Sequence, residues 1–296
     1  MSPRGSSLCS WEAPSTFFHH LFLITKSRNL PLKLRVIIEK DYEAMSRKAA
    51  EIIAKEIRSK PNAVLGLATG STPLGVYQEL IRLYEKENLD FSGVRTFNLD
   101  EYYRLRPEHP ESYHSFMFKN LFEKINVKPE NVSIPDGMAA DIGLFCQSYE
   151  RRIKDAGGID IQLLGIGRDG HIGFNEPGSS LGSRTRLKTL TEETIRDNAR
   201  FFDKEGEVPH FAVTMGVGTI LDAKKLLMLA SGSNKAKAVR DAIEGPVSAQ
   251  VTASVLQLHP NVFVILDEEA ASMLSRSAYY VYVERMAERF EAEAGT

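Results

Sequence analysis

Short apolar segments alternate with amphipathic segments along the chain from about residue 34 onward. Apolar residues recur at helical spacing from Ala44 to Ile57, after a candidate N-cap at Asp41, and predict a helix. Residues 63–67 are continuously apolar and predict a buried strand, and helical spacing returns over residues 73–86. This alternation is typical of βαβ units and predicts an α/β fold: a single doubly wound, Rossmann-like, mostly parallel sheet with helices on both faces.

The same patterns predict the remaining elements. Helices are expected over residues 112–125, 140–156 and 268–292, and strands near 94–97, 160–166, 184–190, 210–215, 225–230 and 261–266. No repeat, low-complexity tract or Pro/Gly-rich linker divides residues 34–296, so we predict one domain there. Ligands of open parallel sheets bind beyond the carboxyl ends of the strands, and the loops at those ends are therefore the candidate sites.

Composition and charge narrow the classes of function. The 296 residues are 43% hydrophobic and 26% charged, which is ordinary for a globular protein with a large core. The formal net charge is −2, whereas nucleic-acid-binding domains usually carry a basic excess, so we expect no nucleic-acid partner. No stretch approaches the roughly 20 apolar residues of a membrane span, so we expect no membrane partner. Cys9 and Cys146 cannot supply a disulfide scaffold or a four-ligand zinc site, and we predict a cytoplasmic protein.

Residues 1–33 differ from the rest of the chain. They contain four cations and one acid, a net charge of +3, so residues 34–296 carry −5. The apolar run of residues 17–24 is interrupted by His19 and His20 and is followed by no small-residue cleavage pattern, which argues against a secretory signal. We expect residues 1–33 to be a disordered extension or an over-long start, and residues 34–296 to be the functional domain.

The first candidate loop follows the strand at residues 63–67. Thr69, Gly70, Ser71 and Thr72 precede Pro73, which suits the first position of a helix. Free backbone N–H groups, three hydroxyls and a glycine can bind an anion at a helix start. The alternative is a well-capped helix without a ligand, because Ser and Thr are also the usual helix caps. The loop is not a nucleotide P-loop, since no Gly-Lys-Ser/Thr follows.

The second loop, after the strand at 94–97, contains the adjacent acids Asp100 and Glu101. A carboxylate there can act as a general base if a low-dielectric cleft raises its pKa. The alternative is a solvated carboxylate that caps the next element.

The third loop follows the strand near 160–166. Three glycines formally match the dinucleotide pattern G-x-G-x-x-G, but helix-breaking residues follow and the expected later acid is missing. Asp169, His171 and Glu176 remain as a group in which two carboxylates can orient the imidazole, raise its pKa and make it a proton shuttle. We expect no metal there, because the histidines elsewhere show no spacing that completes a ligand set.

Several cations lie downstream of these loops. Arg184, Arg186 and Lys188 alternate on a short predicted strand and project from one face. Arg200, and Lys235 at another helix start, are candidates for a phosphate clamp. The alternative for each is an exposed surface cation.

Taken in order, these motifs resemble the glucosamine-6-phosphate deaminases. The similar segments are residues 65–73 (LGLATGSTP), 96–102 (TFNLDEY), 165–177 (GIGRDGHIGFNEP), 183–191 (SRTRLKTLT) and 254–260 (SVLQLHP), and the resemblance covers residues 34–290. It implies conversion of glucosamine 6-phosphate and water to fructose 6-phosphate and ammonia, with no cofactor. His171 would open the sugar ring, held by Asp169 and Glu176, and Asp100 would move a proton between C2 and C1. The phosphate would bind Thr69, Gly70, Ser71, Thr72, Arg200 and Lys235.

The resemblance also implies regulation and assembly. Some deaminases bind N-acetylglucosamine 6-phosphate as an activator at a subunit interface, and the matching positions here are Ser179, Ser180, Arg186 and Lys188. A homo-oligomer, such as a hexamer, is expected on the same ground. We expect residues 190–210 to form a mobile cover of the site.

Two other functions stay open at this point. A 6-phosphogluconolactonase-type hydrolase has a similar Gly-x-Gly-x-Asp-Gly-His segment, although residues 174–177 and the Asp100–Glu101 pair favour the deaminase. A non-catalytic sugar-phosphate sensor would keep the anion loop but would not need the acids.

Overall fold

The computed structural model describes residues 34–199, 202 and 208–295. Its main sheet has seven strands in the order β1-β10-β9-β6-β2-β3-β5, and every neighbouring pair is parallel. This confirms the predicted fold class. The strands are β1 (Leu34–Glu39), β2 (Val64–Leu67), β3 (Arg95–Asn98), β5 (Val132–Ser133), β6 (Ile161–Leu164), β9 (Leu226–Ala230) and β10 (Val262–Asp267).

The order of the strands reverses between β2 and β6. From β2 the chain builds outward through β3 to β5, and it then returns to the other side of β2 to form β6 and β9. The loops after β2 and β6 therefore diverge to opposite faces and leave a crevice at their carboxyl ends, which is where sheets of this type bind ligands.

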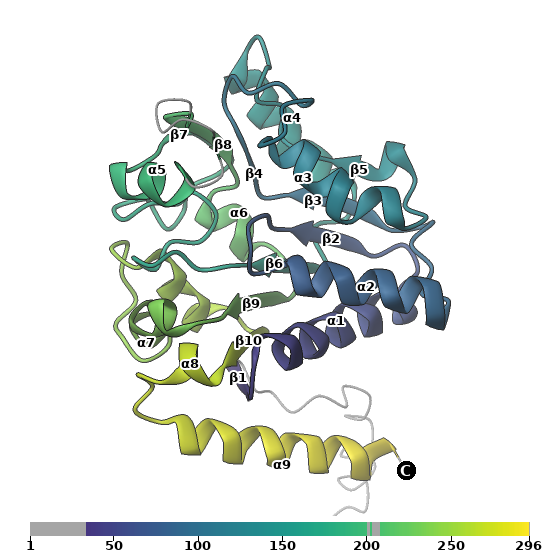
Figure 1. Cartoon of the computed structure of the whole chain (residues 1–296), viewed down its shortest axis with the longest axis vertical. Helices are drawn as coiled ribbons and strands as arrows, with labels where there is room; N and C mark the ends of the chain where they lie inside the picture. Colours follow the sequence, from purple (N-terminus) through teal and green to yellow (C-terminus); the bar gives the residue numbers. More distant parts are fainter. Residues whose placement is uncertain (1–33, 200–201, 203–207, 296) are drawn as a thin grey trace, which may run out of the picture.

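Helices cover both faces of the main sheet (Figure 1). Ile53 of α1 lies next to Leu65 and Leu67 of β2 on one face. Phe97 of β3 projects from the other face and makes an edge-to-face contact with Tyr149 of α4. The helices are α1 (Tyr42–Ser59), α2 (Leu74–Glu87), α3 (Tyr113–Asn120), α4 (Ile142–Asp155), α5 (Glu192–Ala199), α6 (Val217–Leu221), α7 (Ala236–Ile243), α8 (Glu268–Ala271) and α9 (Ser277–Gly295).

A second, antiparallel sheet with the order β4-β8-β7 was not predicted. It comprises β4 (Asp100–Tyr102), β7 (Arg186–Thr189) and β8 (Phe211–Thr214). The strands predicted at 184–190 and 210–215 exist but pair here rather than in the main sheet. Side chains of β7 alternate between partly exposed and exposed, which suits an antiparallel sheet with one solvated face. Asp100, predicted in a loop, lies in β4 opposite Thr214.

The predicted C-terminal helix over residues 268–292 is two helices. It breaks between α8 and α9, where the Glu244 carboxylate accepts hydrogen bonds from the backbone N–H groups of Ser275 and Arg276. α9 then lies along the edge strand β1 (Figure 1). None of the helices in the described part of the chain combines the length and the apolar character that crossing a membrane requires.

Candidate active site

The three predicted loops meet at one cavity of about 190 Å³, at the carboxyl ends of β2, β3 and β6. Asp100 and His171 both line it, together with the loop of residues 69–72 and Lys235. Arg200 and Cys9 lie outside the described residues. A larger cavity of about 1100 Å³ beside α4 contains none of the four predicted catalytic residues. The smaller cavity is therefore the candidate active site.

The loop after β2 has the geometry of an anion-binding turn. Gly70 has φ +99, a conformation that residues with a side chain rarely adopt, and an added Cβ there would meet open space. The cap of α2 is Pro73 rather than a hydroxyl residue, which removes the main support for the capped-helix alternative and places Pro73 one residue before its predicted position. Tyr42, which the sequence did not single out, fixes the loop: its hydroxyl accepts a bond from Gly75 N–H and contacts the carbonyls of Ser71 and Thr72.

Asp100 is a buried carboxylate with 6% of its surface exposed. Burial and the neighbouring Glu101 charge raise its pKa to about 8, against an opposing effect from His171. Gly173, with φ +57, lies against it; a Cβ at that position would be 3.4 Å from Asp100 Oδ2. The glycine therefore lets the third loop approach the carboxylate. A buried base whose pKa is near neutral suits proton transfer.

Glu101 has a different environment. Its carboxylate accepts backbone N–H bonds from Tyr102, Tyr113 and His114 at 2.8, 3.0 and 2.8 Å. Tyr113 and His114 form the first turn of α3, so the negative charge also meets the positive end of the helix dipole. Burial raises the pKa of Glu101 to about 7, although these three bonds oppose the shift. Glu101 thus fixes α3 to β4 instead of facing the cavity.

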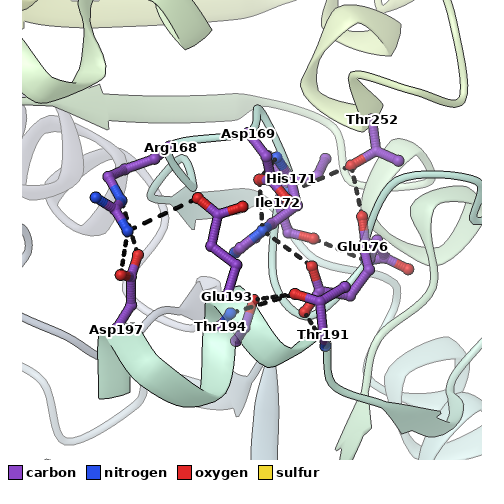
Figure 2. A network of polar contacts seen from close by, with 11 residues as sticks. Arg168, Asp169, His171, Ile172, Glu176, Thr191, Glu193, Thr194, Asp197 and Thr252 are labelled. Atoms are coloured by element: carbon purple, nitrogen blue, oxygen red, sulfur yellow. Dashed lines mark hydrogen bonds and ion pairs between the residues drawn. The ribbon is translucent and has the colours of Figure 1, made fainter. Parts of the chain in front are cut away.

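His171 lies between two carboxylates (Figure 2). Its Nδ1 is 2.7 Å from Asp169 Oδ1 and 3.4 Å from Glu176 Oε2. Burial alone would lower the pKa of His171, but the two acids outweigh it and raise the pKa to about 9. Burial likewise favours the neutral form of both acids, yet His171 lowers the pKa of each. At neutral pH the group is therefore an imidazolium with two carboxylates.

One of the three glycines that mimic a dinucleotide motif, Gly167, makes room for this histidine. A Cβ at Gly167 would lie 2.4–2.7 Å from three atoms of the His171 ring. Gly167 N–H also donates to the backbone carbonyl of His171 at 2.8 Å. Gly167 is therefore required for the ring to pack over the backbone.

Comparison with known proteins identifies the family. The model of the family described as glucosamine-6-phosphate isomerases/6-phosphogluconolactonase matches residues 39–264. This chain belongs to that family. It is 57% identical over 241 residues to the glucosamine-6-phosphate deaminase of Thermoanaerobacter pseudethanolicus, an alignment covering 81% of this chain and 95% of the relative. It is 55% identical over 251 residues to that of Hahella chejuensis, covering 85% and 96%.

Solved structures of deaminases and lactonases resemble this chain as well. A monomeric glucosamine-6-phosphate deaminase superposes with a TM-score of 0.80 at 50% identity, covering 81% of this chain and 99% of that chain. The 6-phosphogluconolactonase of Trypanosoma brucei superposes with a TM-score of 0.66 at 21% identity, covering 81% and 98%. The second similarity shows a shared fold only.

In this member of the deaminase/lactonase family, helix α5 contributes residues that the sequence did not reveal. Thr194, Asp197 and Asn198 line the cavity from this side, and Arg168 of the third loop lines it too. They belong to the first part of the predicted cover at 190–210, whose mobility stays a prediction. Tyr113 also lines the cavity, with its ring stacked on that of Phe174 at a centroid distance of 6.1 Å. No local pattern marked these residues, because tertiary packing brings them to the site.

The histidine group also has metal-ligand geometry. Among the described residues, Asp169, His171 and Glu176 are the only three whose ligand atoms lie together, all within 4.8 Å of one another. The set can be read as one imidazole and two carboxylate ligands or as a hydrogen-bonded proton shuttle. The expectation of no metal stays a prediction.

None of the four predicted activator residues lines the candidate active site, and one of them, Arg186, lines the larger cavity beside α4. Ser179 is buried and Ser180 exposed, while Arg186 and Lys188 share one face of β7. Arg184 was predicted on the same strand as Arg186 and Lys188, but it precedes β7, and its side chain pairs with Glu150 and Asp222. Arg186 instead donates to Asn175 Oδ1 at 2.9 Å, next to Glu176 in the third loop.

Proposed function

We propose that this protein is a glucosamine-6-phosphate deaminase that acts in amino-sugar metabolism, in the degradation of N-acetylglucosamine. Relatives more than 50% identical carry that name. The observation that carries the proposal is the meeting of the buried Asp100, the His171 group and the hydroxyl-rich loop in one cavity. The overall conversion needs no redox cofactor, because C1 is reduced as C2 is oxidised within one molecule.

The dianionic phosphate of the substrate would bind the backbone N–H groups and hydroxyls of residues 69–72. Such a turn before a helix favours negative charge. Lys235 lines the same cavity and would add a cation, and Arg200 is proposed as the second. This end of the cavity orients the sugar so that its reacting carbons approach Asp100.

The reaction would then proceed in two proton-transfer stages. His171, cationic below about pH 9, gives its proton to the ring oxygen as the bond between C1 and that oxygen breaks, and it takes back the proton of the C1 hydroxyl as the aldehyde forms, so it ends in its starting state. Asp169 and Glu176 hold its imidazole. Ionised Asp100 removes the proton from C2 and returns it to C1. The resulting imine at C2 adds water and releases ammonia, which completes the hydrolytic deamination.

An assay of ammonia release from glucosamine 6-phosphate tests the proposal, with 6-phosphogluconolactone as the alternative substrate. We expect ammonia release, and an excess of EDTA should leave the rate unchanged. Lactone hydrolysis without ammonia release would instead support the lactonase. Binding of the sugar phosphate without turnover would support the sensor.

Asp100→Asn should lower turnover by about 10²–10⁴-fold and abolish proton exchange at C2, because it removes the base. Sugar-phosphate binding should persist, since the phosphate contacts are unchanged. Undiminished turnover of the Asp100 variant would remove Asp100 from the mechanism.

His171→Gln should slow the reaction of the closed-ring substrate far more than that of an open-chain analogue.

Activation by N-acetylglucosamine 6-phosphate, through Ser179, Ser180, Arg186 and Lys188, is part of the proposal. The link from Arg186 to Asn175 supports it, since it joins β7 to the catalytic loop. The activator should lower the substrate concentration at half-maximal rate, and Arg186→Ala should remove that response. A flat response in the full chain would contradict it.

We further propose a cytoplasmic homo-oligomer, such as a hexamer, with the catalytic domain formed by residues 34–296. One structural relative is described as monomeric, so assembly of this chain needs its own measurement. Light scattering of the full chain should give a multiple of 33.1 kDa. A mass of one chain at assay concentration would overturn the oligomer.

A further inference from the structure

Arg168 joins the catalytic loop to helix α5 (Figure 2). Its Nε donates to Asp197 Oδ2 at 2.9 Å, and a terminal nitrogen bonds the other oxygen of the same carboxylate. The guanidinium also lies 3.7 Å from Glu193 Oε1. Such a two-bond pair between arginine and carboxylate fixes orientation as well as distance. Arg168 therefore holds the second turn of α5 against the residue that precedes Asp169.

The start of α5 makes a second contact with the catalytic loop, through Thr191, which directly precedes the helix, and Thr194 in its first turn. Thr191 N–H donates to Glu176 Oε1 at 3.3 Å, and the side chain of Thr194 lowers the pKa of the same carboxylate. Thr191 and Thr194 are joined through their hydroxyls at 3.1 Å. The other oxygen of Glu176 is the one that lies 3.4 Å from His171 Nδ1. One oxygen of this acid therefore faces α5 and the other faces the imidazole.

These two contacts are mechanically linked, because Thr194 and Asp197 are three residues apart and lie on the same side of the helix. Glu176 is 1% exposed, so an oxygen that lost its partners on α5 would be left unsatisfied in the interior. The carboxylate would then turn to find new partners and move relative to His171. The position of α5 thus determines the orientation of Glu176.

We propose that Arg168 is a positioning residue: its ion pair with Asp197 seats α5 so that Thr191 and Thr194 hold Glu176 in the orientation that His171 requires. The role rests on the proposed deaminase function. Arg168 acts through α5 and Glu176 and does not need to touch the substrate. Its loss should therefore lower kcat and leave KM nearly unchanged.

Ammonia release by the full chain tests this with Arg168→Gln and Asp197→Asn. Each should lower kcat about 3–10-fold with KM within twofold of the original value. Arg196→Gln is the matched control, because Arg196 lies on the same helix and its described ion pair is with exposed Glu192. The control should keep full activity. A raised KM with unchanged kcat would overturn the proposal by placing Arg168 in substrate binding.

Reversing the pair separates positioning from a general effect of charge. Arg168→Asp and Asp197→Arg should each lose activity, and the double variant should recover much of it because the ion pair re-forms in the opposite sense. Losses that simply multiply would show that the two residues act independently and would overturn the proposal.

Amide hydrogen exchange gives a readout that needs no substrate. Residues 192–199 should exchange faster in Arg168→Gln than in the original chain, while the strands of the main sheet stay protected. Equal exchange would overturn the seating of α5 even if the enzyme were active. Absence of ammonia release by the original chain would overturn the deaminase function and leave this measurement valid.

Discussion

Asp100 and Glu101 are neighbours in β4, but their side chains alternate to opposite sides of the strand. Asp100 lines the cavity, whereas Glu101 accepts the N–H groups at the start of α3. Their charges still interact, since the Glu101 carboxylate contributes to the raised pKa of Asp100. The structural acid therefore makes the catalytic acid more basic, which brings its pKa into the working range of an enzyme.

Glu101→Gln should accordingly move the acid limb of the kcat/KM profile to lower pH. Removing the negative charge makes ionisation of Asp100 easier, and Asp100 then acts as a base at lower pH. The profile should be measured by ammonia release. Glu108→Gln, an exposed substitution on the same connection to α3, is the control and should leave the limb unchanged. An unshifted limb in the Glu101 variant would mean that another group controls it.

At the residue scale, the sequence predicted which residues carry the chemistry better than it predicted which residues contact one another. Asp169, His171 and Glu176 lie within one short loop, so spacing alone indicated that they meet, and the structure brings them together. Arg168 stood in the same loop without any signal, because its partner on α5 is 29 residues away. The sequence did not reveal the role of Gly167 either, because the need for a glycine there becomes visible only when the His171 ring is seen packed against it.

At the scale of elements, periodicity predicted the long helices and the buried strands of the main sheet. It did not predict the second sheet, because β4 has three residues and its register depends on Thr214, more than a hundred residues away. Nor did it predict the break between α8 and α9, where an apolar pattern continues but Glu244 provides the cap. Local pattern carries no information about such distant partners.

The attachment of α9 to β1 is a testable case of a long-range contact. Arg35 makes two bonds to Glu284, at 3.0 and 2.6 Å, and a third to Glu291 at 2.8 Å, while its guanidinium lies 5.1 Å from the centre of the Phe263 ring. Arg35 is 15% and Glu284 11% exposed, so this is neither a solvated surface pair nor a fully buried one.

Arg35→Met should lower the free energy of unfolding by about 2 kcal/mol, between the costs typical of surface and buried pairs, because it leaves Glu284 without its cation. Urea denaturation measures the change. Lys48→Met is the matched control: its bond to Glu288 is more exposed, and the loss should be below about 1 kcal/mol. Catalytic activity should be unchanged in both. Equal losses of unfolding free energy in the two variants would show that the Arg35 interactions stabilise the fold no more than an exposed ion pair does.

At the scale of the whole molecule, the site makes stability depend on pH. The folded-state pKa is raised for Asp100 to about 8, for Glu101 to about 7 and for His171 to about 9. Between about pH 4 and 9 the folded chain therefore binds more protons than the unfolded chain, and stability falls as pH rises. Acids with lowered pKa values, such as Asp160 beside Lys60 and Lys224, act in the opposite direction, but only at the acidic end. Maximum stability is expected near pH 5, where the two effects balance.

Asp100→Asn should remove a large part of this decline. In the original chain, Asp100 is already ionised at pH 5 when the chain is unfolded, but in the folded chain it ionises only as the pH rises toward 8 and against the cost of burial. Stability should therefore fall by about 2–4 kcal/mol between pH 5 and 8 on account of this group. The variant carries no such charge, so it should be more stable than the original chain at pH 8 and much closer to it at pH 5. Urea denaturation at the two pH values measures both. A difference between the chains that does not change with pH would show that Asp100 ionises as easily in the folded protein as in water, and it could not then be a base held near neutrality by burial.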